Sequence, residues 1–294
     1  MSTEFWIAQS FNGLSYGALL FLLASGLSLI FGVMRIVNLA HGDLSILAAF
    51  LAVVAVETLG CNPFLALILV APLMAGLGYA LQMLALNRLL GRGILPPILV
   101  TFGLSIIIQN ALLETFSADS RRLNPGGIET ASLSLGSSGL AIDWFPFITL
   151  GAAVLILVGL QLVISRLSVG RAFRATSDDQ ETAELMGIDN RRLYGLAMAL
   201  SLGIVAVAGV FLGIRTTFTF SSGPDRLLFA FEAVIIGGLG SLWGTLVGGA
   251  VLGIAQTVGA KLSPGWGILT GHLVFLAVLL LRPQGLFTRG RRIA

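Results

Sequence analysis

Charged residues are scarce in this 294-residue sequence: Asp, Glu, Lys and Arg make up 11% of it. Soluble domains typically carry roughly 25%. Hydrophobic residues reach 56%, and the mean hydropathy is +0.96. A soluble fold cannot bury so much apolar surface, so we expect lipid to be the solvent of most of the chain. The same composition excludes an intrinsically disordered chain, a secreted disulfide scaffold and a cytosolic enzyme.

Cysteine, lysine and histidine are almost absent. The single cysteine, Cys61, excludes an internal disulfide and a cysteine-based metal cluster. The single lysine, Lys261, stands in Gly-Ala-Lys-Leu-Ser, which does not fit the Gly-Lys-Ser/Thr of a phosphate-binding loop. With only His41 and His272 available, no His-Glu-x-x-His or similar catalytic pattern occurs. We therefore expect no enzyme activity, no metal site and no cofactor on this chain.

Long apolar runs fill most of the sequence and predict an all-α polytopic membrane protein of about eight transmembrane helices. About 20 apolar residues of helix cross a bilayer core of about 30 Å. The first residues contain no Lys or Arg, so we expect the first run to be a retained span and not a signal peptide. The predicted spans are Ile7 to Phe31, Leu39 to Leu59, Pro63 to Leu86, Ile94 to Phe116, Trp144 to Ile164, Tyr194 to Ile214 and Trp266 to Leu281, with a longer interrupted run at residues 227–259.

Arginine positions predict the orientation, because basic loops favour the cytoplasmic side. With the N-terminus outside, the inner loops hold Arg35, Arg88, Arg92, Arg166, Arg171, Arg174, Arg191 and Arg192, and the outer ones hold Arg121, Arg122, Arg215 and Arg226. We attribute the pI near 9.6 to these inner loops facing anionic lipid, and expect no nucleic-acid partner.

The C-terminal tail is also basic and should be cytoplasmic, so residues 227–259 must contribute an even number of passes. We predict a broken or re-entrant segment here, interrupted at the glycine cluster of residues 237–244. Non-helical backbone at membrane depth is tolerated only in a protein interior or beside a cavity. Gly237, Gly238 and Gly240 are therefore candidate pathway residues; the alternative is a glycine-rich helix in close packing.

The loop of residues 166–192 is predicted to carry a short cytoplasmic helix from Asp178 to Met186. Ser177 and Gln180 fit a capping box, and Gly187 fits the position that ends a Schellman motif. So short a helix needs a partner for its apolar side chains, which indicates docking to a soluble subunit. The alternative is a helix that lies on the membrane surface or packs under the bundle. The candidate docking residues are Arg171, Ala175, Asp178, Asp179, Ala183, Leu185, Met186 and Gly187.

Ionisable side chains at membrane depth are candidate pathway residues. His41 and Asp43 point about 200° apart on a regular helix, so they are not expected to share one small site. A structural alternative is that Asn38 caps the helix and His41 bonds a backbone carbonyl. Glu232 lies in the interrupted run, and we expect Arg226 or Arg215 to be its partner.

Several motifs, in the expected order, resemble permeases of branched-chain amino acid ABC importers, most of all their H-type subunit. The matching stretches are Gly13-Leu-Ser-Tyr-Gly-Ala-Leu, Gly26 to Asp43, Gly170-Arg-Ala-Phe-Arg-Ala, Ala183-Glu-Leu-Met-Gly-Ile, Gly237 to Gly249 and Leu281-Arg-Pro-Gln-Gly-Leu-Phe. The resemblance implies one permease domain over residues 1–294, with residues 166–192 as its coupling loop.

By this resemblance, the partners are a second related permease, two cytoplasmic ATPase subunits that bind ATP and Mg, and a periplasmic substrate-binding protein. The implied location is the bacterial inner membrane. Permeases for urea and short amides belong to the same family and remain an alternative. A self-sufficient ion-coupled transporter that uses Glu232, His41 and Asp43, or a membrane scaffold without a pathway, remain alternatives from another class.

Overall fold

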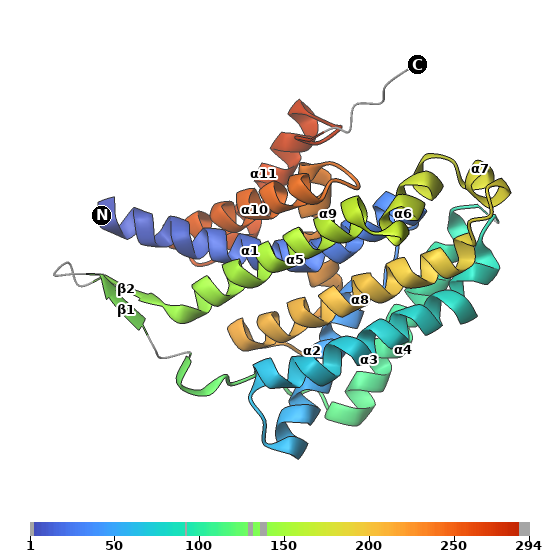
Figure 1. Ribbon diagram of the computed structural model, residues 1–294. Coiled ribbons are helices and arrows are strands. Elements are labelled where there is room, and N and C mark those ends of the chain that lie inside the picture. Colours follow the sequence, from blue (N-terminus) through green and yellow to red (C-terminus); the bar gives the residue numbers. More distant parts are fainter. Residues whose placement is uncertain (1–2, 92, 129–131, 136–139, 288–294) are drawn as a thin grey trace.

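The structure is a computed structural model that describes residues 3–91, 93–128, 132–135 and 140–287. It is a bundle of apolar helices with a small antiparallel hairpin at one end (Figure 1). In chain order the elements are α1 (Thr3–Met34), α2 (His41–Leu59), α3 (Pro63–Leu84), η1 (Leu86–Leu89), α4 (Leu95–Phe116), η2 (Gly126–Ile128), β1 (Ser132–Leu135), β2 (Leu140–Asp143), α5 (Trp144–Arg166), α6 (Ser168–Asp178), α7 (Gln180–Leu185), α8 (Asn190–Arg215), α9 (Gly223–Gly237), α10 (Leu242–Leu262) and α11 (Trp266–Leu281).

The predicted membrane fold is confirmed. Among the described residues, seven helices are long and apolar enough to cross a bilayer, and α11 is a shorter apolar helix of 16 residues. Helix starts follow local chemistry: at α3, for example, the Asn62 side chain accepts a hydrogen bond from the N–H of Phe64, and Pro63 occupies the first turn.

Helices α1 and α8 form the centre of the bundle. In the most apolar stretch of each span, 89% of residues are buried in α1 and 78% in α8, against 22% in α3 and α5. Glycine allows the close approach of α1 to α10, because a Cβ at Gly17 or Gly253 would overlap the backbone of the other helix. Helices α3, α4, α5 and α11 expose their apolar side chains and form the outer layer.

The predicted interruption is confirmed as a helical hairpin. Helix α9 ends at Gly237, α10 begins at Leu242, and the two helices pack antiparallel. Gly238 and Gly240 make the turn with positive φ angles of 101° and 77°, which residues with a Cβ rarely adopt. The two helices therefore run in opposite directions, in agreement with the even number of passes that the sequence predicted.

Two connections that the sequence did not predict enter the bundle from opposite ends. The Nε2 of His41, the first residue of α2, lies 2.9 Å from the carbonyl oxygen of Leu23. Leu23 lies roughly 16 Å from the end of α1 at about 1.5 Å per residue. Residues 35–40 thus lead back into the bundle before α2 starts. Residues 216–222 do the same from the other end, because Gly223, at the start of α9, packs directly against Gly42.

The end of the bundle that carries α6 and α7 is called the α7 end here. Arg35, just after α1, donates from Nη2 to the carbonyl oxygen of Ser177 in α6 at 2.9 Å. The last described residues also lie at the α7 end, since the N–H of Leu286 donates to the carbonyl oxygen of Ile236 near the end of α9. The start of α1 lies at the opposite end (Figure 1).

Candidate functional site

The predicted docking helix, Asp178 to Met186, corresponds to α7 (Gln180–Leu185), and a second helix that was not predicted, α6 (Ser168–Asp178), ends just before Asp179. The Asp179 carboxylate accepts hydrogen bonds from the N–H groups of Glu181 and Thr182 at 3.0 and 3.1 Å. Asp179 is therefore the N-cap of α7. The prediction that Ser177 is the cap was wrong, because its hydroxyl donates to the carbonyl oxygen of Arg174 instead.

The end of α7 follows the prediction. Gly187 has a φ of +85°, the N–H of Ile188 donates to the carbonyl oxygen of Ala183 at 3.1 Å, and the N–H of Gly187 donates to that of Glu184 at 2.9 Å. This pair of bonds is a Schellman motif, so the predicted stop at Gly187 is confirmed.

A buried side chain, Asn190, fastens both short helices to α8. Its Oδ1 accepts from the Thr176 hydroxyl at 2.8 Å, and its Nδ2 donates to the Gln180 carbonyl oxygen at 2.9 Å and to Glu184 Oε1 at 3.1 Å. Ala183 is also buried against the bundle, so it does not share an exposed apolar face with its neighbours in α7. A displacement of α6 and α7 therefore acts directly on α8.

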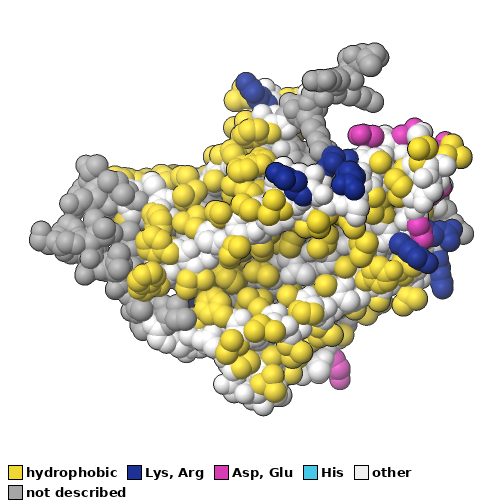
Figure 2. All heavy atoms as spheres, viewed as in Figure 1, with side chains coloured by type: hydrophobic (Ala, Val, Ile, Leu, Met, Phe, Trp, Pro, Cys, Tyr) yellow, Lys and Arg dark blue, Asp and Glu magenta, His cyan; other side chains and the backbone are white. Residues whose placement is uncertain are grey.

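The remaining predicted docking residues face away from the bundle. Leu185 and Met186 are 87% and 80% exposed although both are apolar. The exposed polar or small residues of the set are Arg171, Ala175, Asp178, Asp179 and Gly187. Figure 2 shows hydrophobic side chains across the visible face, with most of the charged ones gathered toward the α7 end. An exposed apolar pair within this polar region is typical of a protein contact.

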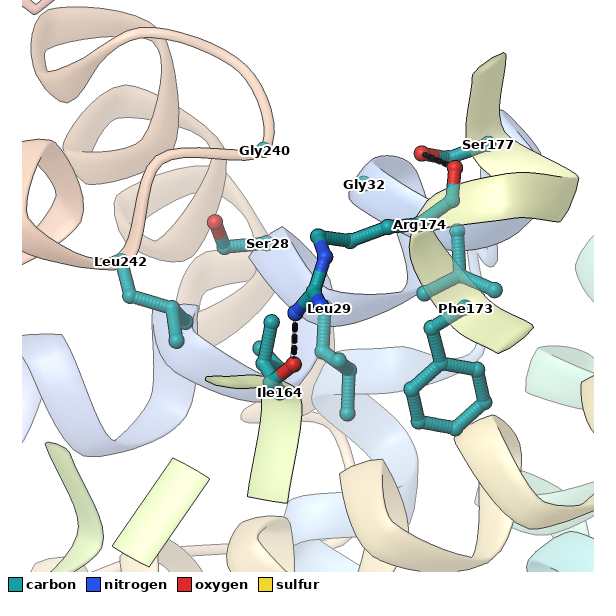
Figure 3. A pocket seen from close by; sticks show the side chains of 10 residues that line it. Ser28, Leu29, Gly32, Ile164, Phe173, Arg174, Ser177, Gly240 and Leu242 are labelled. Carbon is teal, nitrogen blue, oxygen red and sulfur yellow. Dashed lines mark hydrogen bonds between the residues drawn. The ribbon is translucent and has the colours of Figure 1, made fainter. Parts of the chain in front are cut away.

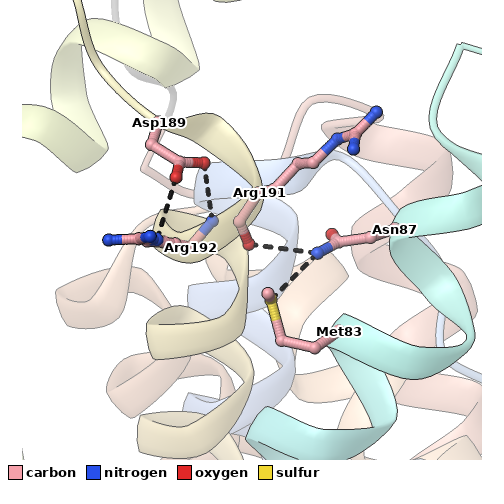
Figure 4. A network of polar contacts seen from close by, with 5 residues as sticks. All are labelled: Met83, Asn87, Asp189, Arg191 and Arg192. Carbon is pink, nitrogen blue, oxygen red and sulfur yellow. Dashed lines mark hydrogen bonds and ion pairs between the residues drawn. The ribbon is translucent and has the colours of Figure 1, made fainter.

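A polar network joins the junction of α7 and α8 to the end of α3 (Figure 4). Asn87 donates from Nδ2 to the Arg191 carbonyl oxygen at 3.2 Å and contacts Met83 Sδ at 3.1 Å. Asp189 pairs with the Arg192 guanidinium at 3.1 Å and accepts from the Arg192 N–H at 3.2 Å. These contacts hold the start of α8 in place directly after α7.

Arg35 connects the short helices to the connection between α1 and α2. Its backbone has a φ of +54°, which is uncommon for a residue with a Cβ. Its bond to the Ser177 carbonyl oxygen falls at the C-terminal end of α6, where the helix dipole favours a cation. A cavity of about 250 Å³ lies beside this connection and is bounded by Gln180 and Tyr194.

The cap at Asp179 predicts a pH dependence for α7. Hydrogen bonds from Thr182 hold the pKa of the Asp179 carboxyl below its ordinary value of 3.8. The cap's contribution to stability is therefore complete above pH 3.8 and is lost as the pH falls through the lower folded-state pKa. We expect hydrogen–deuterium exchange at Thr182, corrected for intrinsic rates, to accelerate across that range. Asp179→Asn keeps an acceptor without the charge, so a transition that persists in this variant contradicts the prediction.

Asn38 and His41 are completely buried near the middle of the bundle. His41 bonds the backbone carbonyl of Leu23, which is the structural alternative that the sequence left open. The Asn38 side chain accepts from the N–H of Ala40 at 3.1 Å. The prediction that Asn38 caps α2 was wrong, because α2 begins at His41 and Ala40 precedes it directly.

Asp43 faces away from His41, as their spacing predicted. The Ser105 hydroxyl donates to Asp43 Oδ2 at 2.5 Å, and Gln109 donates to the Ser105 hydroxyl at 3.2 Å. The other carboxylate oxygen packs against Gly223 at the start of α9. Asp43 itself lies in the first turn of α2, so two positive helix ends surround the carboxylate. This cluster holds α2, α4 and α9 together.

Glu232 in α9 is 2% exposed and pairs with His272 of α11, Oε1 to Nδ1. The His272 ring stacks on Phe229 with 5.7 Å between the ring centroids. The prediction that Arg226 or Arg215 is the partner was wrong, because both guanidinium groups contact other side chains. The pair ties α9 to the outer helix α11.

The candidate glycines Gly237, Gly238 and Gly240 form the corner between α9 and α10. Gly240 borders a cavity of about 40 Å³ between α1, α6 and the end of α5 (Figure 3). There Arg174 donates to the carbonyl oxygen of Ile164. A space this small holds water but not an amino acid. The candidate pathway residues therefore do not meet in one site: they lie in the bundle centre, between α9 and α11, and at this corner.

These features define a class of protein: a polytopic membrane protein with a buried polar centre and a protruding, capped helix pair. The family model described as branched-chain amino acid transport system / permease component matches residues 9–281. The chain belongs to this family.

Curated relatives cover nearly the whole chain. The high-affinity branched-chain amino acid transport system permease protein BraD of Pseudomonas aeruginosa is 29% identical, over 97% of this chain and 96% of BraD. The corresponding protein LivH of Escherichia coli is 27% identical over 98% of each chain. The permease protein LivM of Escherichia coli is 26% identical over 58% of this chain and 41% of LivM.

Proposed function

We propose that this chain is the transmembrane permease subunit of an ATP-binding cassette importer for branched-chain, apolar amino acids. The transport systems in the names of BraD and LivH support the substrate class. The observation that carries the proposal is the exposed pair Leu185 and Met186 on a short helix that is capped at both ends and anchored to α8. Such a helix fits a separate subunit that supplies the energy.

A second, related permease completes the pathway in this proposal, and the similarity to LivM supports such a partner. Two ATPase subunits, which bind the ATP and Mg, dock at the α6–α7 pair of each permease, and a substrate-binding protein delivers the amino acid at the opposite end. Closure of the ATPases displaces α6 and α7. Asn190 passes this displacement to α8, and Arg35 passes it to residues 35–40.

We assign the α7 end to the cytoplasm of a bacterial inner membrane, with the N-terminus outside and the C-terminus inside. The distribution of arginine supports this orientation. The described arginines toward the α7 end are Arg35, Arg88, Arg166, Arg171, Arg174, Arg191, Arg192 and Arg282.

The test is uptake of labelled leucine into vesicles that contain the chain together with its partners. We expect uptake to require ATP and the binding protein, and a second permease and two ATPases to co-purify in mild detergent. Uptake driven by a sodium or proton gradient with this chain alone would contradict the proposal and favour an ion site at the Glu232–His272 pair. A partner binding protein that binds urea or acetamide and not leucine would overturn the substrate assignment.

A further inference from the structure

A cavity of about 420 Å³ lies at the end of the bundle opposite α7, apart from both regions described above. Four helices line it: the beginnings of α1 and α5 and the ends of α8 and α10. Its size falls within the range of roughly 300–1,000 Å³ found for small-molecule sites. Unlike the cavity at the α9–α10 corner, it has room for an amino acid.

Three cationic side chains line the cavity, beside the uncharged polar residues Gln9, Asn12 and Thr257: Arg215 at the end of α8, Lys261 at the end of α10, and Arg122. Within the described part of the chain, neither Arg215 nor Lys261 forms an ion pair. The Arg215 guanidinium is half-buried and lies 5.2 Å from the centroid of the Tyr16 ring, which orients it without neutralising it. A guanidinium held in this way favours a carboxylate ligand.

Backbone pairing brings Arg122 to the same cavity. The N–H of Leu123 donates to the carbonyl oxygen of Gly213 at 2.9 Å, and Arg121 and Phe218 exchange two backbone bonds of 2.9 Å. These bonds fasten the segment after α4 to the end of α8. The Arg122 side chain then donates from Nε to the carbonyl oxygen of Ile214, the residue before Arg215, at 3.2 Å.

The rest of the lining complements the other parts of an amino acid. Asp143, directly before α5, supplies a carboxylate at the cavity. Phe145, Pro146 and Ile214 are buried and supply an apolar wall. Cations, one carboxylate and an apolar surface together match a zwitterion with an aliphatic side chain.

We propose that this cavity is a receiving site for a zwitterionic aliphatic amino acid. The α-carboxylate binds Arg215 and Lys261, the ammonium group binds Asp143, and the side chain packs on Phe145 and Pro146. The assignment rests on the proposed function, because it takes this end as the side where the substrate arrives.

Lys261 provides a direct test because it is the only lysine in the chain. In the purified complex without ATP, we expect millimolar L-leucine to slow acylation of Lys261 by an amine-reactive reagent several-fold. Leucinamide has no carboxylate, so it should give no protection once each rate is corrected for the reagent that the free amine consumes in a parallel sample without protein. Arg215→Gln should abolish the protection by leucine, whereas Arg191→Gln at the α7 end should retain it.

Conservative variants separate recognition from folding. Arg215→Lys keeps the charge and should retain part of the protection. Asp143→Asn should weaken protection by leucine but leave protection by isovalerate, which has the carboxylate and no ammonium group. Three outcomes would each overturn the proposal. They are equal protection by leucine and leucinamide, no protection by leucine, and protection only by the substrate-free binding protein. Because no ATP or uptake enters this measurement, its failure is distinct from a failure of the proposed function.

Discussion

Replacing Gly42 by valine is expected to prevent the chain from folding. A Cβ at Gly42 would overlap the carbonyl oxygen of Gly223, where the starts of α2 and α9 meet backbone to backbone. Helix α2 cannot shift away from α9, because the backbone of Ser45 packs equally closely against Gly209 of α8. Overpacking typically costs about 1–3 kcal/mol and occasionally more. A collision between backbones cannot be relieved by a change of rotamer, so we expect the upper end of that range or beyond.

The measurement is the yield of monodisperse protein on size-exclusion chromatography in mild detergent, together with its thermal midpoint. The matched control is Gly76→Val in α3, where an added Cβ meets nothing within 4 Å. Gly42→Ala should already lower the midpoint, since the collision involves the Cβ itself. Normal yield and midpoint for Gly42→Val would show that α2 and α9 do not meet in this way.

The double substitution Leu185→Glu with Met186→Glu is expected to abolish ATP-driven uptake while leaving the fold intact. Both side chains are exposed, so charging them removes no packing within this chain. Side chains that are hot spots of a protein interface cost at least about 2 kcal/mol when lost, and about 1.4 kcal/mol is tenfold in affinity. We therefore expect docking of the ATPase to weaken by at least about 100-fold.

Leu59→Glu is the control, because this leucine is 65% exposed at the end of α2 away from α7. The readouts are leucine uptake and the amount of ATPase that co-purifies. Loss of uptake and of co-purification in the double variant, but not in the control, is the expected result. Wild-type uptake and wild-type co-purification in the double variant would refute docking at α7.

Features with a local physical cause were predictable from the sequence. Apolar runs long enough for a bilayer predicted the spans, and a count of arginines required the extra reversal that α9 and α10 provide. The stop at Gly187 was predictable because a positive φ selects glycine at that position. The opposite directions of His41 and Asp43 follow from helix geometry alone.

Features that depend on distant partners were not predictable. Asp43 pairs with Ser105 and Glu232 pairs with His272, which are 62 and 40 residues away in sequence. Hydropathy measures transfer of side chains from water and is blind to backbone form, so residues 35–40 and 216–222 could not be distinguished from span ends or surface loops. The cap at Asp179 was missed because Ser177, Asp178 and Asp179 are all residue types that cap helices well, and the sequence alone does not choose among them.

The short connection after α1 has a mechanical consequence. Six residues reach at most roughly 20 Å when fully extended, at about 3.3 Å per residue, so residues 35–40 are a short link between the end of α1 and the start of α2. Arg35 at one end is bonded to Ser177, and Asn38 near the other is fixed in the protein interior. We therefore expect a displacement of α6 to reach the first turn of α2 through this short link, without the bending of a helix.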